Sequence, residues 1–404
     1  MTVPPRILVT GASVAGPAVA YWLDRAGFDV TVVESAARLR EGGQNVDVRA
    51  TGREVLRLMG LEDAVRARNT GEVGTRFLDK SGVVVSEFPV DRHDGRDGPT
   101  AELEILRGAL SRILVDACPE TVTWRFGARV TSLTERVDGV EVTLSSGATD
   151  AYDLVVVAEG VGSLTRELVF GDEPEQRALG MYVTYGTIAR TETDDDWWNV
   201  LVVPDSRQAS LRPDDVGTVR AMLNFLTDGP VLDGLDDEQL RGALRERFED
   251  VGWEVPRILD GLANADDLYV DHLRQVVAPA WHRGRVCLLG DAAWCVTPIG
   301  GGGTSLALTG AYVLAAFLSQ APAGGHLAAF QQYDDWMRPL VEDAQDLPPG
   351  VPRLAAPSSA AGVRVLRWAT KVAALPAVRT VAQRLTSGPE SRRELPRLDL
   401  GDDR

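Results

Sequence analysis

The order of apolar and polar residues at the start of the chain indicates a strand, a helix and a second strand. Residues 6–10 form an apolar run of the kind that fills a buried parallel strand. Apolar residues recur at helical spacing over Pro17–Ala26, and Phe28–Glu34 reads as a second strand. Together they make one βαβ unit of about 30 residues, the usual size. Two later apolar runs, Asp153–Ala158 and Arg285–Leu289, predict further buried strands.

The segments between these strands have a different pattern. Gly74–Val90 and Gly180–Leu226 are amphipathic and interrupted by acidic turns, which is typical of antiparallel strands. Val122–Leu144 predicts two or three strands around the turn Asp138-Gly139. Helical segments are predicted at Glu102–Cys118, Asp236–Val251, Thr304–Gln320 and residues 360–386, the last of them basic and broken at Pro376.

These elements predict an α/β fold with a discontinuous Rossmann-like domain, an inserted and mainly antiparallel β domain, and C-terminal helices. A chain of 404 residues is long enough for two domains. The expected division assigns residues 1–73, 100–175 and 271–345 to the Rossmann-like domain, 74–99 and 176–270 to the inserted domain, and 346–404 to the C-terminal helical region.

Charge and composition narrow the possible partners. The formal net charge of −17 argues against a nucleic-acid surface and against binding to anionic membranes. The three cysteines have no metal-ligand spacing, and their odd number favours a reduced cytoplasm, so no metal site is expected. No signal peptide is apparent. Residues 292–326 carry no Asp, Glu, Lys or Arg, but only Thr304–Gln320 is a continuous helix, which favours a buried core helix over a membrane span.

The first glycine loop, Gly11-Ala-Ser-Val-Ala-Gly16, follows a strand and opens a helix. Gly11 permits a tight turn and Gly16 permits close packing, so that backbone N–H groups and the helix dipole can receive a pyrophosphate. Ser13 stands where a middle glycine is usual. Glu34 ends the second strand, where a carboxylate can accept ribose hydroxyls and would repel the 2′-phosphate of NADP.

Two later motifs resemble further parts of a cofactor crevice. The strand that ends at Ala158 leads into Glu159 and Gly160, in a loop that can face a pyrophosphate and an incoming nicotinamide. Asp291 ends the strand at 285–289 and can accept a hydrogen bond from a polyol such as ribitol. The glycines at 300–303 then open the helix at Thr304, whose N–H groups can stabilise negative charge on a reduced flavin. The two distant glycine loops together predict FAD.

In their order and spacing, these elements resemble the single-component FAD-dependent aromatic hydroxylases, the para-hydroxybenzoate hydroxylase class. The similarity is greatest to the branch with tetracycline-inactivating and antibiotic-pathway monooxygenases, and it covers roughly residues 5–345. The resemblance implies a set of cofactor-binding positions: Gly11, Ser13, Gly16, Glu34, Arg40, Asp47, Arg107, Gly160, Asp291, Pro298, Gly301, Gly303 and Thr304. Of these, Arg40 is the candidate on the nicotinamide side, and Arg49 is a further, weaker candidate.

Three positions depart from the family pattern. Glu159 replaces an Asp, Trp294 replaces a frequent His, and Ser35 replaces a frequent Arg. These changes leave FAD binding in place, but they put the nicotinamide interaction at Glu159 in question. Trp294 is expected on the substrate side.

The resemblance implies a cytoplasmic monooxygenase, monomeric or homodimeric, that consumes NADPH or NADH. It inserts one oxygen atom of O₂ into an aromatic or polycyclic, polyketide-like small molecule through a C4a-hydroperoxyflavin. The alternatives are a flavin-dependent reductase or dehydrogenase that does not use O₂, and a nonenzymatic flavin-binding protein. The substrate, and the choice between hydroxylation and Baeyer–Villiger insertion, stay open. The catalytic residue is unknown: candidates for a base are Tyr182, Tyr185, His272 and His282, and the pair Trp197-Trp198 is either a substrate cap or a hydrophobic loop tip.

Overall fold

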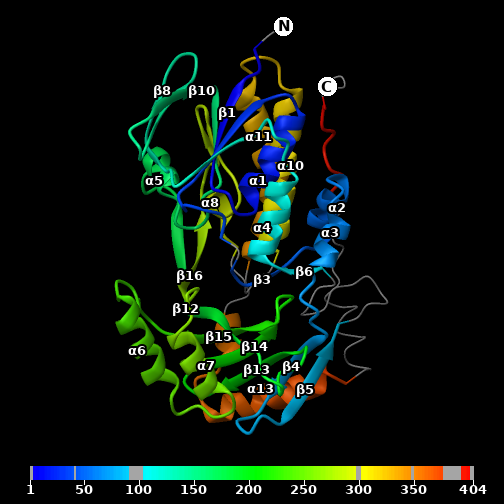
Figure 1. Ribbon diagram of the computed structural model, residues 1–404, viewed down its shortest axis with the longest axis vertical. Helices are drawn as coiled ribbons and strands as arrows, with labels where there is room; N and C mark the ends of the chain where they lie inside the picture. The colour runs from blue at the N-terminus through cyan, green and yellow to red at the C-terminus, as the bar shows by residue number, and fades with distance from the viewer. Residues whose placement is uncertain are drawn as a thin grey trace.

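The computed structural model describes residues 3–40, 42–90, 103–296, 302–346, 350–375 and 393–400. Its first sheet has six strands in the order β17-β18-β11-β1-β2-β7 and occupies the upper half of the view in Figure 1. The strands are β1 (Arg6–Thr10), β2 (Asp29–Glu34), β7 (Thr123–Phe126), β11 (Leu154–Val157), β17 (His282–Arg283) and β18 (Val286–Leu288). The βαβ unit and both later buried strands are therefore confirmed.

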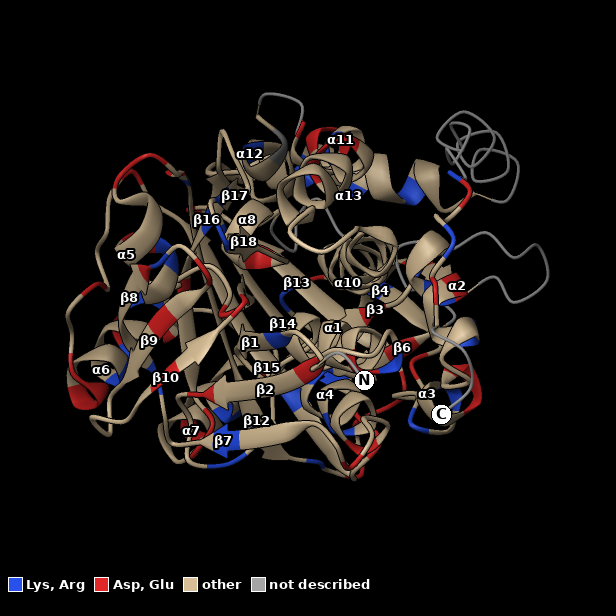
Figure 2. Cartoon of the chain, turned by 90° about the horizontal axis from the view of Figure 1, so that it is seen from above, with Lys and Arg blue, Asp and Glu red and all other residues tan. Residues whose placement is uncertain are grey.

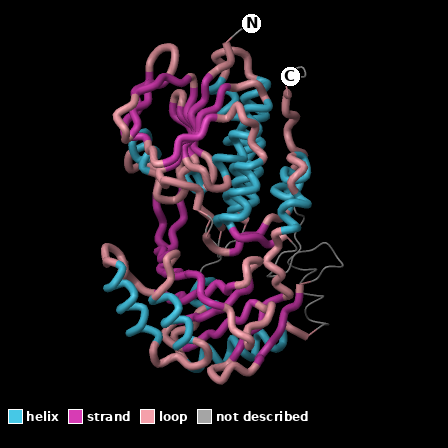
Figure 3. Tube along the Cα trace, in the orientation of Figure 1, coloured by secondary structure: helices cyan, strands magenta, loops and turns pink. Residues whose placement is uncertain are grey.

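Five of these strands are parallel, and β17 alone runs antiparallel to its neighbour β18. Helices α1 (Ala15–Arg25), α10 (Gly303–Gln320) and α11 (His326–Gln345) stand beside this sheet (Figure 3). Helix α10 packs against both α1 and α11 and is buried along most of its length. This explains why residues 304–320 are so apolar: they form a core helix. Within the described ranges, no helix is both long and apolar enough to cross a membrane.

A two-stranded ribbon and a three-stranded sheet flank the parallel sheet. The ribbon pairs β3 (Asn45–Asp47) with β6 (Glu104–Leu106), and the small sheet consists of β8 (Val130–Glu135), β9 (Val140–Leu144) and β10 (Thr149–Tyr152). The prediction of one helix over Glu102–Cys118 is wrong at its start, because helix α4 spans only Arg107–Asp116. All three β6 residues are buried and pair with β3, so tertiary pairing overrides the helical spacing there.

The second sheet has seven strands in the order β16-β12-β15-β14-β13-β4-β5 and lies in the lower half of Figure 1. Its strands are β4 (Gly74–Leu78), β5 (Val84–Pro89), β12 (Glu175–Ala189), β13 (Trp198–Val203), β14 (Arg207–Pro213), β15 (Thr218–Leu226) and β16 (Tyr269–Val277). Only β13 and β4 pair in parallel, so the sheet is mixed and mostly antiparallel. The predicted fold class is thus confirmed. The assignment of residues to domains stays a prediction, and β16 is one continuous strand across the proposed boundary at residue 270.

Helices cover both faces of the second sheet. α6 (Asp237–Phe248) and α7 (Val255–Ala263) contribute Leu244, Phe248 and Ile258 to a core on one face. α13 (Ala360–Ala373) packs Val363 against Val200 on the other face. The predicted basic helix is confirmed over α13, whereas Pro376 and residues 377–386 lie outside the described residues. The helices that the pattern did not predict are α2 (Ala50–Leu58), α3 (Glu62–Ala67), α5 (Leu164–Phe170), α7, α8 (Asp291–Trp294), α11 and α12 (Val351–Ala355).

A buried charge cluster joins the ribbon to the second sheet. Arg212, on β14, donates hydrogen bonds to Glu72 (Nε to Oε2, 2.9 Å) and to Glu104, and both glutamate side chains are only 1% exposed. The guanidinium group also lies 4.1 Å from the centre of the Trp198 ring. Acidic and basic residues are otherwise scattered over both halves of the molecule (Figure 2). One buried cation therefore holds two carboxylates at the junction, and Glu104 Oε2 has no hydrogen-bond partner among the described residues.

Burial raises the pKa of Glu104 to about 8; Arg212 opposes this rise, and Glu72 and Asp47 add to it. Because the folded protein holds this proton more tightly than the unfolded chain, Glu104 contributes full stability below about pH 4.5. That contribution is lost as the pH rises towards 8. We expect Glu104→Gln, which cannot lose a proton, to remove this dependence. The slope at issue is at most about 1.4 kcal/mol per pH unit.

The measurement is thermal unfolding of the wild type and Glu104→Gln at pH 5.5, 7 and 8.5. Relative to the variant, the wild type should become progressively less stable as the pH rises. Glu141→Gln, at an exposed position of strand β9, is the matched control and should show a constant difference. A stability difference between the wild type and Glu104→Gln that is the same at all three pH values would show that Glu104 is already ionised in the folded protein.

Candidate functional site

Four predicted site positions follow the carboxyl ends of neighbouring parallel strands. Because the sheet order is β18-β11-β1-β2, the segments carrying Asp291, Gly160, Gly11 and Glu34 lie in that order along one edge. Ligands of open α/β sheets bind in the crevice outside this edge. The structure therefore brings the early and late motifs to one side of one sheet.

The first glycine loop packs tightly against neighbouring backbone, and this packing requires glycine at two positions. Gly11 has φ of 95°, and a Cβ there would lie 2.4 Å from the Ala158 carbonyl oxygen. A Cβ on Gly16 would lie 1.8 Å from the Gly11 carbonyl oxygen. Helix α1 begins directly behind, with no acidic residue in its first turn and no side-chain hydrogen bond at its N-cap, Val14. Its first N–H groups and dipole are thus available to an anion.

Glu34 ties the end of β2 to this loop. Its Oε2 accepts a hydrogen bond from the Ala12 N–H, and its Oε1 accepts one from the Ala36 N–H, both at 2.8 Å. Ser35 Oγ also donates to Oε1, at 3.1 Å. The carboxylate therefore fixes the loop and stays half-exposed. Ser13 is exposed at the loop's tip, with its Oγ 3.5 Å from Ser111 Oγ on α4.

The late motif packs directly against the early one. Gly290, with φ of 63°, is the N-cap of α8, and a Cβ there would lie 3.0 Å from the Ala15 Cβ at the start of α1. Asp291 is next in sequence, and its Oδ1 would lie 3.9 Å from a Cβ on Gly303, the first residue of α10. The N-termini of α1 and α10 and the Asp291 carboxylate therefore converge at one point of the crevice.

Asp291 has an unusual electrostatic environment. Its side chain stays accessible to solvent, yet protein surrounds it on its other sides. This desolvation raises the pKa of Asp291 to about 6; Arg107 opposes the rise and Asp271 adds to it. A carboxylate in this position can accept hydrogen bonds from the hydroxyl groups of a polyol.

Among the described residues, no side chain caps the start of helix α10. Gly302 is its N-cap, with φ of 78°, and Thr304 lies in the first turn without bonding to the cap. Like that of α1, this N-terminus leaves its N–H groups available to negative charge. Pro298 and Gly301 lie outside the described residues.

The β3–β6 ribbon brings two arginines towards the same crevice. Arg107 starts α4, its N–H donates to the Gln44 carbonyl at 3.0 Å, and its Nε would lie 3.3 Å from a Cβ on Gly43. Arg49 pairs with Asp47 at 2.6 Å, and its N–H donates to Ser305 Oγ of α10 at 2.8 Å. The ribbon is thereby held to the helix that starts beside Asp291.

Two other predicted positions are placed without a partner in the crevice. Arg40 is exposed, after the end of β2. Gly160 has φ of 91°, and a Cβ built on it would meet no atom within 4 Å, so it borders open space.

Glu159 caps a helix. Its carboxylate accepts hydrogen bonds from Ser163 Oγ (2.7 Å), from the Thr165 N–H (3.1 Å) and from Thr165 Oγ1 (2.5 Å), all at the start of α5. Arg166, which is almost fully buried, then donates to the carbonyl oxygens of Ala292 and Val161. This strut connects the Gly160 loop to α8. The side chain of Glu159 therefore has a structural role, which is to hold the start of α5.

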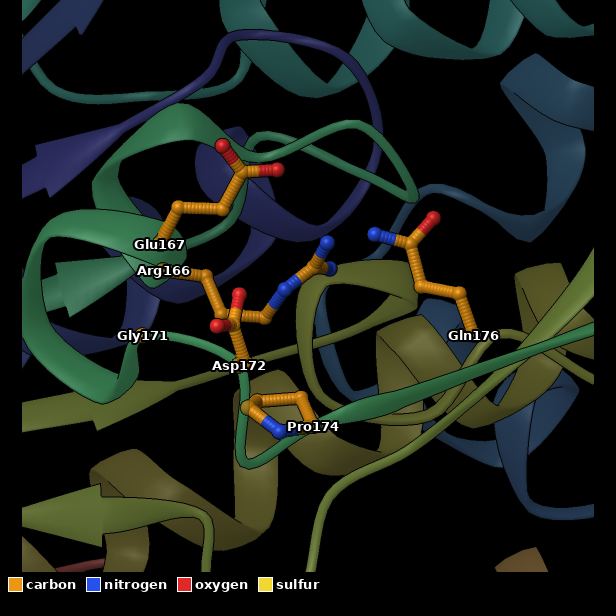
Figure 4. Close-up of a pocket in the computed structure, with 6 residues that line it drawn as sticks. All are labelled: Arg166, Glu167, Gly171, Asp172, Pro174 and Gln176. Atoms are coloured by element: carbon orange, nitrogen blue, oxygen red, sulfur yellow. The ribbon is translucent and has the colours of Figure 1, made fainter.

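A cavity of about 280 Å³ lies beside this strut. The residues that line it are Arg166, Glu167, Gly171, Asp172, Pro174 and Gln176 (Figure 4). None of the predicted cofactor positions lines it. Trp294 does not face a ligand either, because its side chain is buried among other aromatic rings. Its ring centre lies 4.4 Å from that of Trp281, and the ring also packs near Tyr333. The expected position of Trp294 on the substrate side is therefore not supported.

The four candidate bases lie in different places. Tyr182 stacks on His272 at 4.5 Å in the face that α6 and α7 cover, and its hydroxyl donates to Asp233. His282 packs near Phe330 of α11. Only Tyr185 points to the opposite face of the second sheet, where Arg107 lowers and burial raises its pKa, burial being the larger effect.

Tyr269 was missed by the sequence reasoning. It is directly opposite Tyr185 across β12 and β16, with ring centres 4.9 Å apart, and Arg107 acts on its pKa too. Its position depends on strand register, which no local motif records. The pair Trp197-Trp198 has other contacts: Arg76 lies over the first ring and Arg212 over the second, both at 4.1 Å.

These residues fit FAD in three respects. Gly11 and Gly16 are packed too closely to carry a Cβ, no side chain of the described residues caps the N-termini of α1 and α10, and one accessible carboxylate lies between the two loops. The glycine loop and the helix N-termini suit a pyrophosphate and an electron-rich ring. The carboxylate suits a polyol.

The comparisons with known proteins agree with this geometry. The family model described as FAD binding domain matches residues 5–346. Flavin-dependent monooxygenase eupH of Phoma sp. is 38% identical over 390 residues, 90% of each chain. A flavin-dependent monooxygenase of Legionella longbeachae is 34% identical over 348 residues, 84% of this chain and 87% of its own. The crystal structure of tetracycline destructase Tet(51) has a TM-score of 0.80 at 31% identity, covering 98% of this chain and 100% of that one.

The matched range contains both glycine loops, the Asp291 segment and the second sheet. The expected family and cofactor are therefore confirmed, and the reading as a nonenzymatic flavin-binding protein is wrong. NADPH or NADH is the reductant typical of such enzymes. The chain belongs to the FAD binding domain family and is an FAD-dependent monooxygenase.

Proposed function

We propose that this enzyme inserts one oxygen atom of O₂ into an aromatic or polyketide-like small molecule, with NADPH or NADH as reductant. The observation that carries the proposal is a mostly apolar surface on the second sheet, next to the crevice. Met181, Val183, Tyr185 and Leu273 form its buried part, and Leu179, Met222 and Leu226 are partly exposed beside them. We call these seven residues the apolar floor. A flat, weakly polar ring system is the chemistry that such a surface would hold.

The end of the floor that carries Tyr185 lies towards the crevice. Tyr185 is paired with Met222 on β15 and with Tyr269 on β16. Arg107 acts electrostatically on Tyr185, Tyr269 and Asp291, so the aromatic end of the floor lies near the polyol-binding carboxylate. This arrangement would place a substrate ring beside the bound flavin.

When bound, FAD would supply the redox chemistry between NAD(P)H and O₂. The chain's own contribution is to bind, orient and exclude water. In the proposal the α1 N-terminus and Glu34 hold the nucleotide end, and Asp291 holds the ribitol hydroxyls. The α10 N-terminus stabilises negative charge on the reduced ring. The apolar floor keeps water from the reacting atoms.

The proposal is tested by an NAD(P)H-oxidation screen of the FAD-loaded enzyme against polyphenols, polyketides and tetracyclines, with O₂ uptake and hydrogen peroxide recorded in parallel. A substrate accelerates both NAD(P)H and O₂ consumption without a matching rise in peroxide. A panel in which every ring compound leaves NAD(P)H oxidation unchanged, or raises peroxide in full proportion, would contradict the proposed substrate class.

Asp291→Ala should weaken FAD binding by about 10- to 100-fold, because it removes a charged acceptor of ribitol hydroxyl hydrogen bonds. The dissociation constant is measured from the recovery of flavin fluorescence on release. Asp138→Asn, at an exposed position between β8 and β9, is the control and should bind FAD like the wild type. Equal affinity in Asp291→Ala and the wild type would remove Asp291 from the cofactor site.

Tyr185→Phe should lower kcat/KM by about 3- to 30-fold and raise the fraction of peroxide, because it removes one hydroxyl from the aromatic end of the floor. Tyr182→Phe is a closely matched control, since this tyrosine is three residues away on the same strand but faces α6 and α7. If both variants uncouple to the same extent, the effect comes from the strand and not from substrate contact.

A further inference from the structure

A second cavity, of about 620 Å³, lies at the far end of the apolar floor. Leu179 and Leu226 belong both to the floor and to the wall of this cavity. Gly180, Ser206 and Thr227 continue the wall on the sheet side, and Pro352 of α12 lies opposite. The cavity and the aromatic end of the floor are therefore parts of one face of the sheet.

The C-terminal helices cross this face. The Gln345 side chain at the end of α11 donates to the Val276 carbonyl of β16 at 2.8 Å. Gln208 of β14 donates to the Ala355 carbonyl at the end of α12 at 2.9 Å. On the β13 side, α13 packs Val363 on Val200. With these anchors on β16, β14 and β13, α12 forms a roof over the cavity.

The distance from the aromatic end to the cavity follows from strand geometry. Met222, Asn224 and Leu226 point to the same face of β15, and each step of two residues is about 7 Å. The cavity wall at Leu226 is therefore about 13 Å from the Tyr185–Met222 row. Between them Asn224 Oδ1 is buried without a hydrogen-bond partner among the described residues, and it can accept one from a ligand.

Resting on the function proposed above, we propose that this cavity is a distal subsite for a substrate tail. The substrate would then be a ring with a long, neutral chain that carries few oxygen atoms. The wall is made of leucine and proline side chains with the hydroxyl groups of Ser206, Thr227 and Ser358. The charged residues at its border, Asp228 and Arg353, are exposed and face each other at 3.5 Å, so they balance in charge. A neutral tail therefore fits better than a carboxylate or an ammonium group.

The experiment compares binding of 5-methyl-, 5-pentyl- and 5-nonylresorcinol to the FAD-loaded enzyme by isothermal titration calorimetry. Each fully buried methylene strengthens binding by up to about fourfold. We expect the nonyl compound to bind at least tenfold more tightly than the methyl compound in the wild type. Thr227→Trp, which fills the cavity, should reduce this gain to less than threefold and leave the methyl compound's affinity unchanged.

Two further variants guard against a general disturbance. Val231→Trp adds the same side chain at a nearby exposed position outside the cavity and should keep the full gain. Thr227→Ala opens the cavity and should keep it as well. Absence of any gain with chain length in the wild type, or an undiminished gain in Thr227→Trp, would overturn the distal subsite. Calorimetry requires no turnover, so this failure is separate from a failure to consume NAD(P)H and O₂ with ring compounds.

Discussion

The crevice depends on the close approach of two helix N-termini at the edge of one parallel sheet. Gly290 lies against Ala15, with space for a hydrogen atom but hardly for a side chain. This contact places the start of α1, at Ala15, beside Asp291 and the start of α10, which come 276 and 288 residues later in the chain. The fixed positive ends of both helices then point to one elongated anionic molecule. Without that approach, the early loop would be an ordinary nucleotide loop.

The same contact explains why the crevice was predictable from sequence. Glycines at 11, 16 and 290 and a carboxylate at 34 are each required by local geometry, so that the residue type alone reports the structure. Strand order supplied the rest, since the carboxyl ends of parallel strands share an edge. Glu159 was harder to interpret, because its carboxylate bonds to Ser163 and Thr165, and this capping role is visible only once α5 is known.

The substrate side was not predictable in the same way. Side chains alternate between the two faces of β12, so the sequence indicates that Tyr182 and Tyr185 lie on opposite faces. It does not indicate which of these faces packs on α6 and α7 and which faces the crevice. Tyr269 becomes relevant only through its register with Tyr185. The strand at Glu104 was not predicted either, because the spacing of apolar residues there fits a helix. Only its pairing with β3 identifies it as a strand. Contacts across sheets have no short-range signal.

The charge cluster of Glu72, Arg212 and Glu104 connects these two parts. A buried cluster of this kind is a poor source of stability, because the desolvation of Arg212 and Glu72 offsets most of their attraction, and burial keeps Glu104 protonated near neutral pH. It does, however, tolerate few geometries, since a shift of the ribbon relative to β14 would separate Arg212 from Glu104. The ribbon carries Asp47 and leads into Arg107, while β14 neighbours the strand that carries Met222. The cluster therefore restricts the distance between the cofactor crevice and the apolar floor, as the proposed transfer of oxygen to a ring bound on that floor would require.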